Sequence, residues 1–218
     1  MSCNSDKKVN TENDNLIKKT ALKYAEGFEI HHYKNHKTLI IKKPYQGATE
    51  KFTYTLVKNK VDKNAIEIPL KNIVATSTTH IPMLELLGVE EKLIGFPSVN
   101  FISSKRTRKR IDNKQIIDVG NPESMNVETL LNLKPSAVIG FSINSNNELG
   151  NTLNKMNIPY LYNADWLEKT PLGRTEWIKF FGVLFDKEKE ADSIFNQIES
   201  NYLEAKKIAA KTEKKPLV

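Results

Sequence analysis

The run IIDVGNPESMNVETLLNLKPSAVIGFS, residues 116–142, decides the fold of this chain. It contains a short β-branched strand at Ile116–Val119, a turn, a short helix that opens at Asn126, and a second apolar strand at Ala137–Gly140. The Asn126 side chain can cap the helix, and Pro135 prevents the helix from continuing. A strand, a helix and a strand this close together form a βαβ unit, whose strands run parallel. The stretch therefore predicts an α/β fold with a parallel sheet.

The same order of strand, loop and helix recurs on both sides of this run. The further predicted strands are Ile73–Ala75, Lys92–Gly95 and Pro159–Tyr162, and the further helices include Ile81–Leu87 and Asn146–Met156. Thr170 and Pro171 are typical of a helix start, and the helix that follows has an inner stripe of Trp177, Ile178, Phe181 and Leu184. We expect residues 71–185 to form one Rossmann-like lobe with a parallel sheet, and we expect this lobe to bind a ligand.

Different patterns precede and follow this lobe. Residues 1–19 are polar and predict a disordered tether, whereas residues 20–70 contain Phe28–Ile30, Thr38–Ile41 and Phe52–Val57, which predict an antiparallel β meander. His31 and His32 are neighbours in a strand and point to opposite faces, so we expect no metal site there. Residues 186–215 predict one long helix, and residues 216–218 resemble the start of another strand.

Composition excludes some classes of function and leaves others open. The net charge of +7, from 33 Lys+Arg against 26 Asp+Glu, fits a solvated surface. Ser103–Arg110 is a dense basic run, but it lacks interleaved aromatic residues, so we expect an exposed helix and no nucleic-acid partner. Cys3 is the single cysteine, so the chain forms no internal disulfide.

Polar, small and aromatic residues follow the ends of the predicted strands. In a parallel sheet these positions lie along one edge, where open α/β sheets bind ligands. The candidate ligand-binding residues are Ser77, Thr78, Thr79, His80, Phe96, Pro97, Asn121, Pro122, Glu123, Phe141, Ser142, Asn144, Asp165, Trp166 and, near the rim, Arg174. Aromatic faces mixed with hydroxyl and amide groups suit a bulky, partly polar ligand. Arg174 could contact a ligand carboxylate or phosphate, or pair with Glu168 or Glu176.

A bare metal ion would need several converging His or carboxylate ligands. Only His80, Glu123 and Asp165 qualify in this lobe, so a chelated metal or a tetrapyrrole suits the loops better. A bare metal-ion receptor stays open as an alternative, and so does an enzyme with its active site at the same edge. We identify no catalytic residues and no cofactor.

The pattern G-x-x-x-S-x-N-x-E-x-x-L-x-L-K-P-x-x-V-I, which spans Gly120–Ile139, resembles a signature of substrate-binding proteins of ABC importers. The group it resembles captures iron–siderophore complexes, haem, cobalamin or metal ions. Asn72–Gly88, the segment Pro171–Trp177 and the long helix after Asp186 fit the same group. The resemblance covers residues 71–218.

The resemblance implies a receptor, not an enzyme, that delivers a chelated metal to a membrane permease. A long helix joins two lobes in this family, so the chain is expected to be an amino-terminal lobe with its interlobe helix. Glu128 takes the position of an exposed Glu that docks on the permease, and Cys3 resembles the lipid-bearing Cys of a lipoprotein. A monomeric, membrane-anchored protein of the cell envelope is therefore expected.

Overall fold

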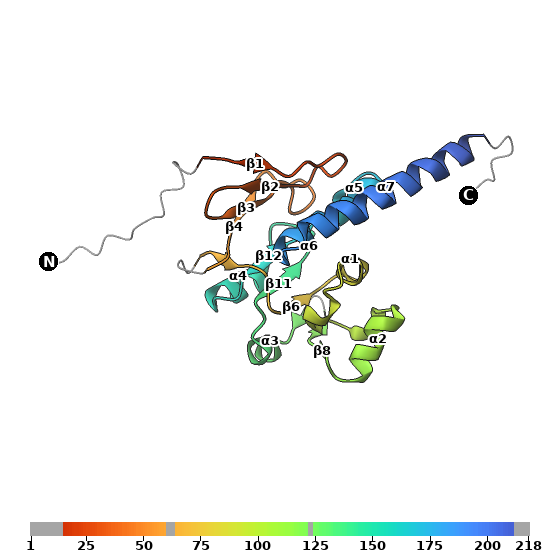
Figure 1. Cartoon of the computed structure of the whole chain (residues 1–218). Helices are drawn as coiled ribbons and strands as arrows, with labels where there is room; N and C mark the ends of the chain where they lie inside the picture. Colours follow the sequence, from red (N-terminus) through yellow and green to blue (C-terminus); the bar gives the residue numbers. More distant parts are fainter. Residues whose placement is uncertain (1–14, 60–63, 122–123, 212–218) are drawn as a thin grey trace.

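The computed structural model describes residues 15–59, 64–121 and 124–211, which form two five-stranded sheets, a two-stranded hairpin and a set of helices (Figure 1). Among these residues no helix combines the length and the apolar character that crossing a membrane requires. Cys3, Pro122 and Glu123 lie outside the described residues.

Five parallel strands form one sheet, which we call the parallel sheet, in the spatial order β12-β11-β6-β7-β8. Their bounds are β6 Ile73–Ala75, β7 Leu93–Phe96, β8 Ile117–Asp118, β11 Ala137–Gly140 and β12 Tyr160–Tyr162. The chain starts at the central strand β6, adds β7 and β8 on one side, and then returns to add β11 and β12 on the other. The parallel α/β sheet expected from the sequence is confirmed. The strand order reverses between β6 and β11, and we call this place the switch point.

Four helices connect these strands: α1 His80–Leu86, α2 Lys105–Asp112, α3 Val127–Leu133 and α4 Glu148–Lys155. The Asn126 side chain caps α3 by accepting a hydrogen bond from the Thr129 backbone N–H at 2.9 Å, as the sequence predicts. The crossover through α3 passes over two strands, because β6 and β7 lie between β8 and β11. Where a plain loop was expected after β8, a small hairpin forms from β9 Gly120–Asn121 and β10 Ser124–Met125.

The second five-stranded sheet, which we call the N-terminal sheet, contains β1 Lys18–Lys19, β2 Phe28–His32, β3 Lys37–Ile41, β4 Phe52–Val57 and β5 Ile66–Glu67. β2, β3 and β4 form the antiparallel meander expected from the sequence. β1 pairs antiparallel to β2 at Lys18–Lys19, where a disordered tether was expected, because its backbone hydrogen-bonds to the edge of the meander, and β5 pairs parallel to β4. The apolar face of this sheet points into the core through Phe28, Ile30, Leu39, Ile41 and Leu56. The N-terminal sheet meets the parallel sheet at the edge strand β12, where the Tyr162 backbone N–H donates to the Tyr54 hydroxyl at 3.1 Å.

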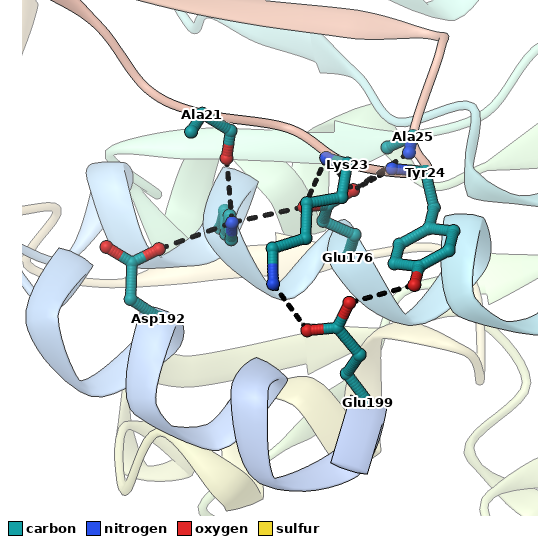
Figure 2. Close-up of polar contacts among 8 residues, drawn as sticks. Ala21, Lys23, Tyr24, Ala25, Glu176, Asp192 and Glu199 are labelled. Atoms are coloured by element: carbon teal, nitrogen blue, oxygen red, sulfur yellow. Dashed lines mark hydrogen bonds and ion pairs between the residues drawn. The ribbon is translucent and has the colours of Figure 1, made fainter. Parts of the chain in front are cut away.

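Residues 21–27, which we call the strap, join β1 to β2 and are held by a buried carboxylate (Figure 2). Glu176 is fully buried and accepts hydrogen bonds from three successive backbone N–H groups, those of Lys23, Tyr24 and Ala25, at 2.7–3.0 Å. Lys179 supplies the compensating charge, because its ammonium lies 3.1 Å from Glu176 and 3.4 Å from Asp192. The backbone dipoles and the ammonium together satisfy a charge that would otherwise be costly to bury.

A second buried carboxylate holds the end of the strap. Glu168 accepts hydrogen bonds from the backbone N–H groups of Glu26 and Gly27 and from the indole N–H of Trp177 at 2.8–3.1 Å. A side chain at Gly27 would clash with the Trp177 ring, because an added Cβ would lie 2.8 Å from it. The strap therefore packs flush against the helices that follow β12.

Those helices are α5 Pro171–Glu176, α6 Ile178–Leu184 and α7 Glu188–Ala210. Thr170 caps α5 with Pro171 at its start, as predicted, but the single helix expected here is divided at Trp177. Every residue of α6 is buried, so α6 is a core helix. The sequence predicted an inner apolar stripe with a solvent-facing side opposite it, and α6 has no such side. The 23 residues of α7 span about 35 Å and project beyond the body (Figure 1).

Candidate functional site

The carboxyl ends of the five parallel strands carry the loops in which the sequence places its candidate residues. Two of these loops flank the switch point, Thr76–Thr79 after β6 and Phe141–Asn144 after β11. Open α/β sheets bind ligands in the crevice at such a point, because neighbouring loops diverge there. We call this side of the sheet the strand-end edge.

The loop after β6 is short and is held by its own hydroxyl groups. The Ser77 and Thr79 hydroxyls lie 2.8 Å apart, and the Ser77 hydroxyl also accepts from the Thr79 backbone N–H at 3.3 Å. Thr78 and Thr79 are exposed, whereas Ser77 is partly covered. The loop therefore presents hydroxyl groups to solvent at the switch point.

His80 lies beneath this loop as the first residue of α1 and is fully buried. Its ring packs against Phe181 with 5.4 Å between ring centroids. Burial lowers the pKa of His80 to about 4, although the negative charge of Asp165 and the nearby Asn163 side chain act in the opposite direction. Neither ring nitrogen has a partner of hydrogen-bonding geometry in the described part of the chain, so Asn163 approaches the ring without forming a regular bond.

The next two strands place fewer candidates on the surface. Phe96 and Pro97 are buried, so they support the loop from below. The Asp118 carboxylate fixes the adjoining turn by accepting from the backbone N–H groups of Gly120 at 2.9 Å and Ser98 at 3.2 Å. Asn121 is exposed on the β9–β10 hairpin.

The loop after β11 combines an apolar surface with ordered polar groups. Ser142 is buried, and its hydroxyl donates to the Asn144 backbone carbonyl at 2.6 Å. Phe141 is 36% exposed, and Ile143, which is not among the sequence-predicted residues, is 69% exposed. Phe101 in the segment after β7 is also absent from that set and is 70% exposed. Ile143 stands between Ser142 and Asn144 in a polar loop, which was the available signal, whereas Phe101 adjoins Ile102 and carried no such signal.

The loop after β12 turns inward. Asp165 is buried and Trp166 is half-buried, with an indole N–H that is enclosed and has no partner among residues 15–59, 64–121 and 124–211. Arg174 is exposed and donates to the backbone carbonyls of Glu168 at 3.1 Å and Trp166 at 3.4 Å. The alternative expectation that Arg174 pairs with the Glu168 or Glu176 carboxylate is wrong, because the strap occupies both carboxylates.

Two further sequence features have a clear structural setting. Glu128 is exposed in the first turn of α3, where a carboxylate also favours the helix dipole. The basic run forms α2, in which Arg106 pairs with Glu90, while Arg108 donates to the Val99 carbonyl at 3.0 Å. Some of the positively charged side chains of α2 therefore bind groups within the protein.

A bare metal site was one alternative for this surface. Within the described ranges, no group of three or more His, Cys, Asp or Glu side chains is arranged to hold a metal ion.

Comparison with known proteins extends the resemblance noted in the sequence. An uncharacterised lipoprotein of Methanocaldococcus jannaschii is 27% identical to the chain over 99% of its length, and the chain spans 60% of that relative. A second uncharacterised protein of the same organism is 30% identical over 60% of the chain, which spans 40% of it. The chain thus spans less than two thirds of the length of these curated relatives.

Solved structures share the fold. The petrobactin-binding protein of Bacillus subtilis superposes with a TM-score of 0.53 at 20% identity, over 72% of this chain and 54% of that one. A periplasmic haem-binding protein of Vibrio cholerae gives a TM-score of 0.52 at 17% identity, over 67% of this chain and 52% of that one. The family model for periplasmic binding proteins matches residues 73–218, which is more than half of the chain. The chain therefore belongs to the periplasmic binding protein family.

Proposed function

We propose that this chain is the amino-terminal lobe of an ABC-importer receptor that captures a chelated metal, such as a ferric siderophore, haem or cobalamin, and performs no chemistry on it. The observation that carries this proposal is the surface beside the switch point, where exposed Phe141 and Ile143 lie next to a loop with exposed Thr78 and Thr79. Apolar area suits the organic shell of a chelate, and hydroxyl groups suit its polar edge. Family membership supports the same role.

Binding can be tested by calorimetric titration with haem, cobalamin and a ferric siderophore. The variant Phe141→Ala/Ile143→Ala should weaken binding about tenfold or more, because each exposed apolar side chain contributes area to the contact. A suitable control is Met156→Ala/Ile208→Ala, which removes similarly exposed apolar side chains away from this edge. If the protein binds none of the three ligands, or if both variants lose affinity equally, the proposed site is wrong.

Trp166 offers an independent optical reading of the same event. It is half-buried at the strand-end edge, whereas Trp177 is fully buried under the strap. Ligand binding should therefore quench mainly the fluorescence that Trp166→Phe removes. Equal quenching in that variant would place the ligand elsewhere.

The permease contact and the membrane anchor are further parts of the proposal. Exposed Glu128 would dock on arginines of the permease, so Glu128→Arg in the full-length receptor should abolish complex formation without changing ligand affinity. Glu148→Arg is the matched control, because Glu148 is also exposed in the first turn of its helix.

Cys3 would carry a lipid that holds a monomeric receptor at the cell envelope, so Cys3→Ser should release it from the membrane fraction. A complex that survives Glu128→Arg, or a Cys3→Ser protein that stays with the membrane, would refute the corresponding role.

A further inference from the structure

A groove of about 550 Å³ lies between the N-terminal sheet and α7, away from the strand-end edge. Its walls come from β1, the strap, the ends of β2 and β3, the start of α6 and the first turns of α7. Two carboxylates, Glu188 and Asp192, face six lysines across it. The lysines are Lys18, Lys19, Lys23, Lys37, Lys179 and Lys189.

Half of these lysines are neutralised within the protein. Lys23 pairs with Glu199 at 2.5 Å, Lys37 pairs with Glu188, and Lys179 is held by Glu176 and Asp192. These ion pairs occupy both carboxylates of the groove wall. The acidic side chains that face the groove are therefore already engaged and leave the other lysines uncompensated.

Lys18, Lys19 and Lys189 are the uncompensated group. All three are exposed, and none forms an ion pair with any residue that the structure describes. Of these three, Lys18 also acts on His32, whose ring is hydrogen-bonded to the Thr20 hydroxyl at 2.8 Å. Burial is the main cause that lowers the pKa of His32, and the charges of Lys18 and Lys37 lower it further.

We propose that this lysine groove binds a phosphate-bearing anion. A phosphate group concentrates up to two negative charges on three acceptor oxygens. Lys18 lies opposite His32 in the strand pairing and shares its face. The ammonium groups of Lys18 and Lys189 can therefore match that charge, while Lys19, the next residue of β1, adds positive charge beside them. The groove is separate from the proposed chelate site, so it would serve a second ligand. Phospholipid head groups and soluble phosphate esters share the required chemistry.

The 218-residue protein can be tested against both sources. One arm measures sedimentation with vesicles of phosphatidylglycerol and phosphatidylcholine, against vesicles of phosphatidylcholine alone. The other arm measures calorimetric binding of inorganic pyrophosphate. The variant Lys18→Gln/Lys19→Gln/Lys189→Gln should weaken binding in the responsive arm about tenfold or more, since three positive charges are removed from the groove and its border.

A charge-matched control separates a site from general attraction. Lys105→Gln/Lys109→Gln/Lys155→Gln removes the same charge from exposed lysines outside the groove, and its affinity should stay within about twofold of the unmodified protein. Binding in the vesicle arm alone would identify a head group as the ligand, and binding of pyrophosphate would identify a soluble phosphate. Equal losses in both variants, or no binding in either arm, would overturn the proposal. Circular dichroism of each variant verifies that the fold is retained.

Discussion

The strap and the strand-end edge both bury polar groups, but they treat them in opposite ways. At the strap, Glu176 and Glu168 are surrounded by backbone N–H groups and an indole, so each charge has its partners. At the strand-end edge, the His80 ring nitrogens and the Trp166 indole N–H are buried with no partner among the described residues. Full satisfaction gives a rigid attachment, whereas unsatisfied buried groups are a cost that proteins usually accept at functional sites. This difference distinguishes the strap, which stabilises the lobe, from the strand-end edge, which we propose binds the chelated metal.

The largest effect is expected where the satisfied charge is removed. Glu176→Gln leaves Lys179 buried without its main partner and turns an amide toward the strap N–H groups. Breaking a buried pair in this way costs about 3–5 kcal/mol. We expect urea unfolding to show this loss in the free energy of unfolding. Glu199→Gln, at a pair whose Lys23 partner is half exposed, should cost far less. Equal losses in the two variants would mean that the burial of Glu176 is not what makes its contacts with the strap strong.

Acid pH should act on the other region. The pKa of His80 in the folded protein is about 4, below the ordinary 6.5, so the unfolded chain binds the proton more readily. The neutral His80 ring contributes its full share of the free energy of unfolding above about pH 6.5. This contribution is lost as the pH falls from about 6.5 toward the folded pKa of about 4. Between about pH 7 and pH 5 the loss is about 2 kcal/mol. Urea unfolding at the two pH values measures it, and His80→Phe should remove most of this pH dependence. An unchanged dependence in that variant would mean that other groups cause it.

The close contact of α6 with α7 provides a smaller test of rigidity near the strap. An added Cβ at Gly182 would lie 2.7 Å from the Ala191 Cβ, so Gly182→Ala introduces a clash. Overpacking typically lowers the free energy of unfolding by about 1–3 kcal/mol, and the better helix propensity of Ala raises it by about 1 kcal/mol. We expect a net loss of about 1 kcal/mol in thermal or urea unfolding. Gly182→Ala/Ala191→Gly should recover part of that loss, and a double variant that is the sum of the single variants would exclude direct contact.

The sequence predicted one of the two regions far better than the other. The parallel sheet follows from repeated local patterns such as Ile73–Ala75 and Ala137–Gly140, whose hydrophobic runs and following breakers are visible within a few residues. The order of the strands creates the switch point, and it depends on contacts between distant segments that local patterns do not encode. The strap has no local sequence pattern either.

The contacts of the strap cannot be predicted from local sequence, because every non-proline residue carries a backbone N–H that could bind a carboxylate. Glu176 binds backbone groups that lie 151–153 residues earlier, and no side-chain motif at Lys23–Ala25 marks them as its partners. Trp177 illustrates the same limit, because its apolar spacing fits one continuous helix although the chain divides there. Exposed Ile143 was likewise overlooked, since apolar residues are usually assigned to a core.

The smallest expected effect sharpens the comparison most. At about pH 7, His80→Phe replaces a ring whose nitrogens lack partners among the described residues by an apolar ring that can pack on Phe181. Replacing an unsatisfied buried polar group by an apolar one of similar shape is nearly neutral or stabilising. We expect the free energy of unfolding to change by less than about 1 kcal/mol, in contrast to the loss at Glu176. A loss as large as that of Glu176→Gln would show that His80 has strong polar partners after all, and the two regions would then be built alike. A neutral result combined with altered haem or siderophore affinity would instead assign His80 to binding and not to stability.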